Sequence, residues 1–583
     1  MTEAKDPIFA FLQTIQLFSH VPEDILLNLA NGFERVLIPG GEVLIKEKEI
    51  GDCLYIVMHG LFKVYQKHYW IADVGAGEII GEIAILTKEK RMATVQAARD
   101  SEVLKLTQES FHDFLVKYPE AMLGCIRKAV HRLVSPPLPK EKRKTLKTIA
   151  ILAAGNNPHF TKFSSQFIRE FSLRSKILHV NSSNCSVNAI SWLSEKEKEY
   201  EYLIYETDST LTEWSRFCFR QADRIVLVAL AEESPELNEL EQFLWDTKEL
   251  QAITKNLVLL HPPYSIEPKN VIDWTFLRHN IYHHNVRLSS EEDFNKLLRF
   301  LSGQAVGLVL SGGGARGLAH VGVLRAFEEA KISIDCIAGS SMGAIIAASY
   351  SIGMNAHTIL EQVENLLVPA AETLDYTLPF LSVKSGKNVT LALQRAFGKE
   401  RHIEQSWTNF FCVSTNLSTS SCKIHKKGLL WEAIRASISI PAIFPPVITA
   451  QKEVLVDGGV MNNMPVDIMR QQIHEGKILA SSIMAPEEHT HFDPLPPWVS
   501  GWDMFTKHLN WDNREKIPHI GDIILPAIML SSNEHQKQME TLADHCIRID
   551  LPKYGLMEFG SYEAIIEAGY IAAQKHLEKN PNF

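Results

Sequence analysis

Apolar and polar positions follow three successive patterns along the chain of 583 residues. Residues 1–135 begin with helical spacing, continue as short runs punctuated by glycine between 36 and 106, and end with helical spacing over 109–134. Short alternating runs between turn residues predict β-strands. We therefore expect the first region to be a β-roll with flanking helices.

A proline-rich, basic stretch over 136–147 separates this region from the next. It holds three prolines and five Lys or Arg side chains. Such a composition supports neither a helix nor a central strand, and it predicts a linker. A solvated charge run is the favoured interpretation, and a contact with anionic lipid is the alternative.

Residues 148–302 alternate short apolar runs with polar helical patterns, which predicts a small parallel α/β connector domain. The apolar runs are 149–153, 177–180, 202–205, 225–229 and 257–260. The first run leads into Ala154-Gly155-Asn156-Asn157-Pro158, which lacks the Gly-Lys-Ser/Thr ending of a phosphate-binding loop. We expect a scaffold or docking role for this domain.

Residues 303–583 open with two consecutive strand–turn–helix patterns, which predict a C-terminal α/β domain. The strand 306–310 runs into the glycine-rich turn 311–317, and the strand 335–338 runs into Gly339-Ser340-Ser341-Met342-Gly343. The first turn also satisfies the dinucleotide fingerprint, which requires an acidic residue at the end of the following strand. A serine stands there instead, so the nicotinamide interpretation is rejected.

Ser341 is the candidate nucleophile of this domain. Flanking glycines permit the sharp turn that lifts a serine hydroxyl above the edge of a sheet at the start of a helix. The backbone N–H groups of Gly312, Gly313 and Gly314, one strand earlier, could stabilise an oxyanion. A glycine–serine turn alone is a weak signal, but the two turns together favour acyl transfer.

No histidine has a local setting that marks it as the base, although the chain has 23 of them. His320 lies in the helix after the glycine-rich turn, where helix packing is the simpler interpretation. Asp457 ends the strand 454–457 and precedes two glycines, which let a carboxylate approach another loop closely. Read alone, Asp-Gly indicates a hairpin turn, so both interpretations stay open on local sequence.

The motifs GGGARG, GSSMG and DGG, in that order, resemble those of the patatin-like phospholipases, most closely the neuropathy target esterase branch. The resemblance extends over 434–446, 462–465 and 498–511. It implies Ser341 as the nucleophile and Asp457 as the base, without a histidine. It also implies Gly312–Gly314 as the oxyanion hole, Arg316 as support for that loop or for a phosphate head group, phospholipid or lysophospholipid substrates, and no catalytic metal or cofactor.

The first region resembles a cyclic nucleotide-binding domain over residues 10–133. The resemblance rests on the phosphate cassette, whose matching residues are Gly81, Glu82, Ala84, Arg91, Ala93 and Thr94. A helical turn with free N–H groups could face an anion, and Arg91 would supply the charge. Met92, where cGMP-selective members tend to carry threonine, favours cAMP as the regulatory ligand. The alternative is a domain that keeps the fold and binds nothing.

Composition limits the partners and the compartment. The net charge of −10 argues against nucleic acid, and eight scattered cysteines without a CxxC pair favour reduced thiols over disulfides or a zinc site. No apolar run reaches membrane-spanning length and no signal peptide is apparent, so we expect a cytoplasmic protein with peripheral membrane contact. An apolar stripe of Trp498, Trp502, Phe505 and Leu509 is interpreted first as a packing face and second as a lipid-facing one.

These patterns indicate a serine hydrolase, and the two resemblances imply a lysophospholipase or phospholipase that is regulated by a cyclic nucleotide. The alternative is a catalytically idle cyclic-nucleotide sensor or scaffold. Intact Ser341 and Asp457 argue for the enzyme.

Overall fold

The structure is a computed structural model that describes residues 7–118, 147–483, 498 and 532–580, apart from residues 16–17, 19–20, 67–68, 88, 186–189, 252, 280, 374, 379 and 474. The chain divides into two compact units, one of residues 1–260 with 273–283 and one of residues 261–272 with 284–583. The predicted linker 136–147 lies outside the described residues, except for Lys147.

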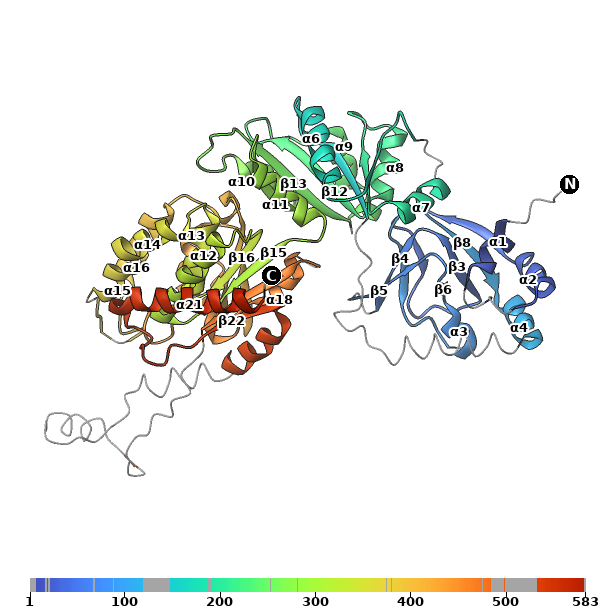
Figure 1. The fold of residues 1–583 in the computed structure, drawn as a ribbon. Coiled ribbons are helices and arrows are strands. Elements are labelled where there is room, and N and C mark those ends of the chain that lie inside the picture. The colour runs from blue at the N-terminus through green and yellow to red at the C-terminus, as the bar shows by residue number, and fades with distance from the viewer. Residues whose placement is uncertain are drawn as a thin grey trace, which may run out of the picture. The chain divides into compact units, whose positions relative to one another are not determined.

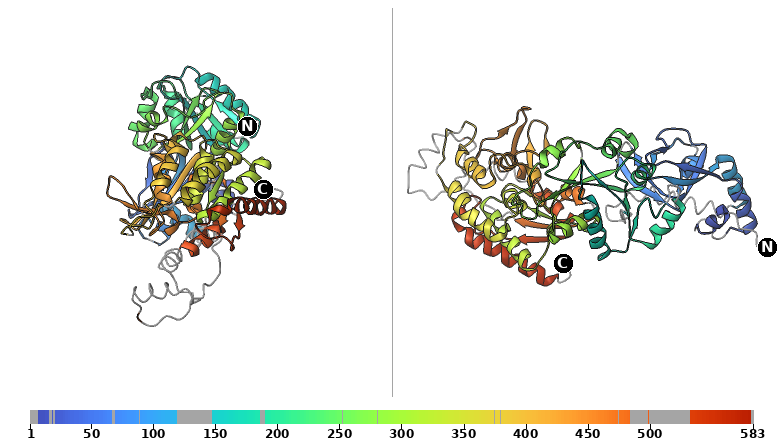
Figure 2. Two further views of the ribbon diagram at one scale, coloured as in Figure 1. Left: turned by 90° about the vertical axis from the view of Figure 1, so that its left-hand side faces the viewer. Right: turned by 90° about the horizontal axis from the view of Figure 1, so that it is seen from above.

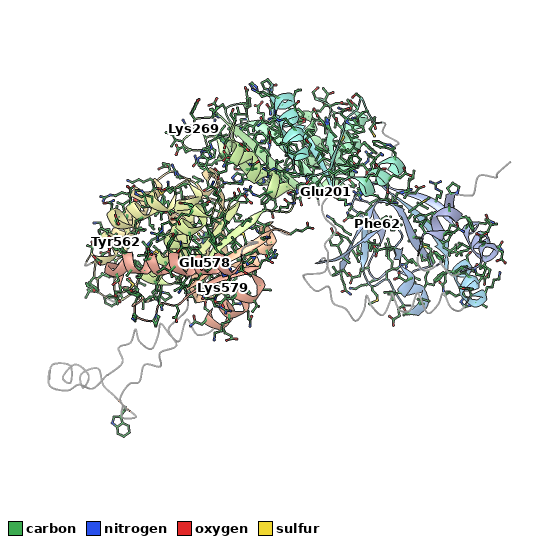
Figure 3. The ribbon with its side chains drawn as sticks, in the orientation of Figure 1. Phe62, Glu201, Lys269, Tyr562, Glu578 and Lys579 are labelled. Atoms are coloured by element: carbon green, nitrogen blue, oxygen red, sulfur yellow. The ribbon has the colours of Figure 1, made fainter. Side chains whose placement is uncertain are left out.

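Two four-stranded antiparallel sheets form the β-roll at the start of the first unit, with strand orders β1-β8-β3-β6 and β2-β7-β4-β5. Val57, Phe62 (labelled in Figure 3) and Val103 are fully buried in the core of this roll. The strands are β1 Glu34–Ile38, β2 Val43–Ile45, β3 Cys53–His59, β4 Leu61–Gln66, β5 Tyr69–Gly75, β6 Ile79–Ile80, β7 Thr94–Ala97 and β8 Ser101–Thr107. The helices are α1 Pro7–Gln13, α2 Glu23–Ala30, α3 Glu82–Thr87 and α4 Gln108–Lys117. The predicted helix 109–134 is described only as far as α4.

A parallel sheet with the strand order β10-β11-β9-β12-β13-β14 follows. Its strands are β9 Thr148–Ala153, β10 Ile177–Val180, β11 Tyr202–Glu206, β12 Arg224–Leu230, β13 Thr254–His261 and β14 Tyr282–Arg287. The helices between residues 148 and 302 are α6 Phe160–Ser172, α7 Ile190–Glu199, α8 Glu213–Gln221, α9 Glu239–Asp246, α10 Val271–Phe276 and α11 Glu291–Leu301, of which α11 belongs to the second unit. Five strands coincide with the five predicted apolar runs, because strands covered on both faces read as continuous apolar stretches. The sixth, β14, was not predicted because its sequence, YHHNVR, is largely polar.

An eight-stranded sheet, ordered β19-β20-β17-β16-β15-β21-β22 with β18 beside β17, forms the centre of the second unit. The strands are β15 Val306–Leu310, β16 Cys336–Ser340, β17 Asn409–Asn416, β18 Ser421–His425, β19 Val447–Ile448, β20 Val454–Asp457, β21 Lys477–Ile483 and β22 His545–Ile549. The helices are α12 Ala319–Glu329, α13 Met342–Ser351, α14 Ala356–Gln362, α15 Val368–Glu372, α16 Lys387–Phe397, α17 Leu430–Ser437, α18 Val466–Ile473 and α21 Tyr562–Lys579. Strands β17, β16, β15, β21 and β22 are parallel, whereas β20 is antiparallel to β17.

Helices cover both faces of this sheet, and α21 lies on the outer side of the unit along α12 (Figures 1 and 2). The two helices approach so closely that a Cβ on Gly322 would overlap the backbone oxygen of Ile566, and one on Gly569 would overlap that of Ala319. Figure 3 labels Tyr562 at the first turn of α21 and Lys579 at its last turn.

The strand register brings two candidate residues to the same level of the sheet. Ser340 pairs with Val413 in the parallel β16–β17 ladder, so Ser341 follows at the level of Ser414. Ser414 pairs with Asp457 in the antiparallel β17–β20 ladder. Ser341 and Asp457 therefore lie on either side of β17 at one end of the sheet.

No described helix combines the length and the apolar composition that are needed to cross a bilayer. Of the predicted stripe from Trp498 to Leu509, only Trp498 is described, and its side chain is 83% exposed. Trp502, Phe505 and Leu509 lie outside the described residues.

Candidate active site

Ser341 occupies a sharp turn between β16 and α13. Its backbone has φ 50° and ψ −124°, a region that a residue with a side chain rarely adopts. The flanking glycines allow this turn, because a Cβ on Gly339 would overlap the backbone of Gly343 and one on Gly343 would overlap the carbonyl of Leu310. The sequence thus folds here into a strained elbow that presents one hydroxyl at the start of a helix.

Asp457 is directly hydrogen-bonded to this hydroxyl. Ser341 Oγ donates to Asp457 Oδ2 at 2.7 Å, and the N–H of Gly459 donates to Asp457 Oδ1 at 2.7 Å. The Asp457 side chain is buried, and burial raises its pKa from the ordinary 3.8 to about 7, although the two hydrogen bonds oppose that rise. The carboxylate is therefore basic enough to accept a proton near neutral pH.

The segment from Ser437 to Ser439 holds both groups in position. Ser437 Oγ accepts a hydrogen bond from the backbone N–H of Ser341 at 3.1 Å, and the carbonyl of Ser439 accepts one from the N–H of Asp457 at 2.9 Å. Sequence reasoning assigned no role to these two serines. The only signal that could have found them was their position inside the matching stretch 434–446.

The glycine-rich turn after β15 lies against the elbow. A Cβ on Gly312 would stand 3.0 Å from Ser341 Cβ, so glycine is needed for this approach. The N–H of Gly312 donates to the backbone oxygen of Asn463 at 3.1 Å. The N–H groups of Gly313 and Gly314 have no acceptor within the described part of the chain. Two unengaged donors thus follow one that is already engaged.

Arg316 lies in the 3₁₀ turn that follows these glycines. Its side chain is buried, and its Nε and Nη1 atoms have no partner among the described residues. Burial lowers the pKa of the guanidinium below its usual range. A buried cation with open donors is a suitable contact for an anionic group.

The histidines near the sheet have other partners. His320 is fully buried between Ser481 Oγ, 2.8 Å from Nδ1, and the backbone oxygen of Ser311, 2.8 Å from Nε2. Burial lowers the pKa of His320 to about 4. Across the described ranges, no histidine hydrogen-bonds to Ser341 or to Asp457. The described geometry thus pairs the serine with a carboxylate alone.

In the first unit, the cassette residues Gly81, Glu82 and Arg91 come together beside β3. Gly81 has φ 88° and leads into α3, whose first residue is the buried Glu82. Arg91 is also buried, and it donates to the carbonyl of Gly81 at 2.8 Å and to that of Cys53 at 2.6 Å. The guanidinium is thereby held in a fixed place next to the turn.

The remaining cassette residues lie on both sides of Arg91. Ala84 is buried in α3, Ala93 precedes β7, and Thr94 begins β7 and accepts a hydrogen bond from the N–H of Glu47 at 3.0 Å. Met92 is 41% exposed. The structure thus gathers the predicted cassette residues in one part of the roll.

The turn after β9, unlike the glycine-rich turn after β15, is bonded to a carboxylate of the chain itself. The N–H of Gly155 donates at 2.8 Å to Glu241 Oε2, a carboxylate of α9 that is fully buried. The guanidinium of Arg278, also fully buried, donates to the other oxygen of Glu241 at 2.7 Å. An internal anion thus occupies the position where a phosphate loop would hold its ligand.

Among the described residues, no group of three or more His, Cys, Asp and Glu side chains is placed to hold a metal ion.

Sheet, elbow and buried carboxylate together define the second unit as an α/β domain with a serine–aspartate pair. Three family models match the chain. They are Cyclic nucleotide-binding domain over residues 35–118, Neuropathy Target Esterase family P-loop like domain over 145–300 and Patatin-like phospholipase over 308–470. The chain thus carries three regions that are similar to these families, in the order cyclic nucleotide-binding domain, P-loop like domain and patatin-like phospholipase.

Curated relatives are similar over most of the chain. Patatin-like phospholipase domain-containing protein 6 of Homo sapiens is 28% identical over 91% of this chain and 44% of its own length. Neuropathy target esterase sws of Drosophila melanogaster is 28% identical over 95% of this chain and 44% of its own length. The chain thus spans less than half the length of these relatives.

Among solved structures, the Thermus thermophilus Catabolite Activator Protein matches 20% of this chain and 58% of its own, with 25% identity and a TM-score of 0.20.

Proposed function

We propose that the second unit hydrolyses carboxylic esters of phospholipids or lysophospholipids, with Ser341 as nucleophile and Asp457 as general base. The observation that carries this proposal is the 2.7 Å hydrogen bond between Ser341 Oγ and a carboxylate whose pKa is raised to about 7. A carboxylate with its ordinary pKa is a weak base, which is why most serine hydrolases place an imidazole between the two. Burial of Asp457 removes that difficulty.

The reaction follows from these positions. Ser341 Oγ bonds to the ester carbonyl carbon while its proton passes to Asp457 Oδ2, and the carbonyl oxygen becomes an oxyanion. The tetrahedral intermediate then expels the alkoxy group, which takes the proton from Asp457 and leaves an acyl-serine. Water then bonds to the acyl carbon while its proton passes to Asp457. The second tetrahedral intermediate expels Ser341 Oγ, which takes the proton back from Asp457, and the fatty acid leaves.

We infer that the oxyanion donors are the N–H groups of Gly313 and Gly314, since that of Gly312 is engaged by Asn463. Each such donor typically contributes about 3 kcal/mol to the transition state. Gly312 instead allows the turn to approach Ser341. Arg316, with two open donors, supports a substrate class that carries a phosphate.

We also infer that the β-roll binds a cyclic nucleotide, cAMP by preference, and thereby regulates the hydrolase at a membrane surface. Arg91 and the turn at Gly81 support a phosphate contact, because a phosphodiester out of water needs a cation. Full-length protein titrated with cAMP in a calorimeter tests binding. Lipid hydrolysis with and without cAMP tests regulation.

The decisive experiment compares wild type with Ser341→Ala on a soluble short-chain chromogenic ester. We expect loss of turnover in Ser341→Ala and retention in Ser340→Ala, because Ser340 is fully buried in β16. An organophosphonate should label Ser341 alone, and turnover should persist in excess chelator. A label on Ser340, or equal turnover by both variants, contradicts the proposal.

A further inference from the structure

The loop between α15 and α16 carries five exposed large apolar side chains within eight residues, more than any other stretch of that length in the described part of the second unit. Over residues 376–383 the exposed fractions are 64% for Tyr376, 75% for Leu378, 91% for Phe380, 73% for Leu381 and 45% for Val383. Soluble proteins rarely expose large apolar side chains in contiguous groups, and such groups mark an interaction site.

Backbone hydrogen bonds give this loop a defined shape. The N–H of Thr377 donates to the carbonyl of Val383 at 3.0 Å, and that of Ser385 donates to the carbonyl of Asp375 at 2.8 Å. The loop is thus a closed projection whose two ends meet. Its apolar side chains therefore stay exposed together.

The charged groups of the loop point to internal partners. Asp375 accepts a hydrogen bond from the hydroxyl of Ser385, and Lys384 Nζ donates to the backbone oxygen of Ala371 at 2.7 Å. The tip between them, where described, is formed by Tyr, Thr, Leu, Phe, Ser and Val residues. Contact with this tip therefore depends on apolar burial and not on charge.

The loop is anchored to Ala442 and Ile443, which closely follow the segment from Ser437 to Ser439 that contacts the candidate active site. The N–H of Val383 donates to the carbonyl of Ala442 at 2.8 Å, and that of Lys384 donates to the carbonyl of Ile443 at 2.9 Å. Ser437, which lies shortly before Ala442 in the sequence, accepts a hydrogen bond from the N–H of Ser341. Whatever binds the loop is therefore held close to the elbow along one short stretch of chain.

We propose that the described residues of this loop, 375–378 and 380–385, are the membrane-docking element of the hydrolase and that its apolar tip inserts into a lipid interface. Interfaces with proteins are usually anchored by Trp, Tyr and Arg in close-fitting pockets, whereas Leu and Val are under-represented as anchors. A projecting tip of Leu, Phe and Val side chains suits a deformable apolar medium. The inference rests on the proposed function, since it is a lipid substrate that requires the elbow to be near the interface.

The test uses the full chain with Leu378→Ser, Phe380→Ser and Leu381→Ser combined. Binding is measured by flotation with phosphatidylcholine vesicles in the Ser341→Ala background, so that it does not depend on catalysis. We expect binding to fall by about tenfold or more, since each deeply buried Leu or Phe contributes that order on its own. Because the tip carries no free charge, binding by the parent protein should persist at high salt.

A matched control replaces three exposed apolar residues outside the loop, by Leu173→Ser, Leu542→Ser and Ile571→Ser. It should bind vesicles as the parent does. In the catalytically intact background, the loop variant should lose turnover of vesicle lipid by a similar factor and keep its turnover of the soluble ester within about twofold.

The outcomes separate the two proposals. Vesicle binding that survives in the loop variant, or that requires anionic lipid and disappears with salt, overturns the docking assignment. Loss of concentration-dependent self-association in place of vesicle binding overturns it as well, because the loop is then a contact between copies. Absence of soluble-ester turnover in wild type refutes the proposed function and leaves the binding result standing.

Discussion

Two glycine-containing turns occupy equivalent positions in their sheets but differ in whether their backbone N–H groups have acceptors. Each follows the first strand, in chain order, of its sheet, β9 in the first unit and β15 in the second, and each contains glycine. The N–H of Gly155 is satisfied by Glu241, whereas those of Gly313 and Gly314 have no acceptor among the described residues. Both turns lie at the carboxyl ends of strands, where α/β sheets bind ligands. We call the turn at Gly155 filled, because its N–H is bonded to Glu241, and the turn at Gly313 and Gly314 open, because its N–H groups are available to a ligand.

The largest effect should come from removing the base next to the open turn. We expect Asp457→Asn to lower kcat/KM on the soluble ester by about 10⁴-fold, because an amide cannot accept the proton of Ser341. His320→Gln is the control, since the hydrogen bonds of His320 to described residues go to Ser311 and Ser481. If His320→Gln silences the folded enzyme as fully as Asp457→Asn does, the base is a histidine and the proposed pair is wrong.

Burial of the Asp457 carboxylate should also lower the free energy of unfolding, by an amount that depends on pH. Because burial raises the pKa of Asp457 from 3.8 to about 7, its stabilising contribution is complete below pH 4 and is lost as the pH rises through 7. The loss amounts to roughly 4 kcal/mol at most. Thermal unfolding of Asp457→Asn should therefore occur at a higher temperature than that of wild type at pH 8, with the difference vanishing near pH 4.

Activity should have the opposite pH dependence. The base functions only when ionised, so kcat/KM should rise as the pH increases through about 7. A rate that is flat from pH 5 to 9 contradicts the raised pKa.

Glu241→Ala removes the carboxylate that is bonded to the turn at Gly155. It also leaves Arg278 buried without its ion-pair partner. We expect a loss of about 3 kcal/mol in the free energy of unfolding. Glu239→Ala, at an exposed position of the same helix, is the matched control. Turnover of the soluble ester by folded protein should not change. Millimolar phosphate should raise the melting temperature of Glu241→Ala but not that of wild type, and an equal response of both proteins would falsify the assignment of a filled site.

The smallest effect is expected at the cassette. Arg91→Ala should weaken cAMP binding by the full chain by about 30-fold, since one charge-assisted hydrogen bond to a phosphate contributes about 2 kcal/mol. Lys90→Ala, at the neighbouring exposed position, should bind as wild type does. Calorimetry that detects no heat with wild type would favour a domain that retains the fold without the ligand.

Sequence patterns were sufficient where structure depends on neighbours along the chain. Apolar runs predicted β9 to β13, and paired glycines predicted the elbow at Ser341. They were insufficient where a contact joins distant residues. Glu241 is 86 residues from Gly155, and Asn463 is 151 residues from Gly312, so neither partner leaves a local signal. The pairing of Ser341 with Asp457, 116 residues apart, was expected from family resemblance and not from spacing.

The ion pair between Glu241 and Arg278 makes it difficult for single mutations to free the N–H of Gly155 for a ligand. Replacement of Glu241 alone leaves the charge of Arg278 fully buried, and replacement of Arg278 alone leaves the carboxylate in the same state. Each single change lowers stability before any new ligand can compensate. Opening the turn after β9 to an anionic ligand therefore requires a change of both residues together.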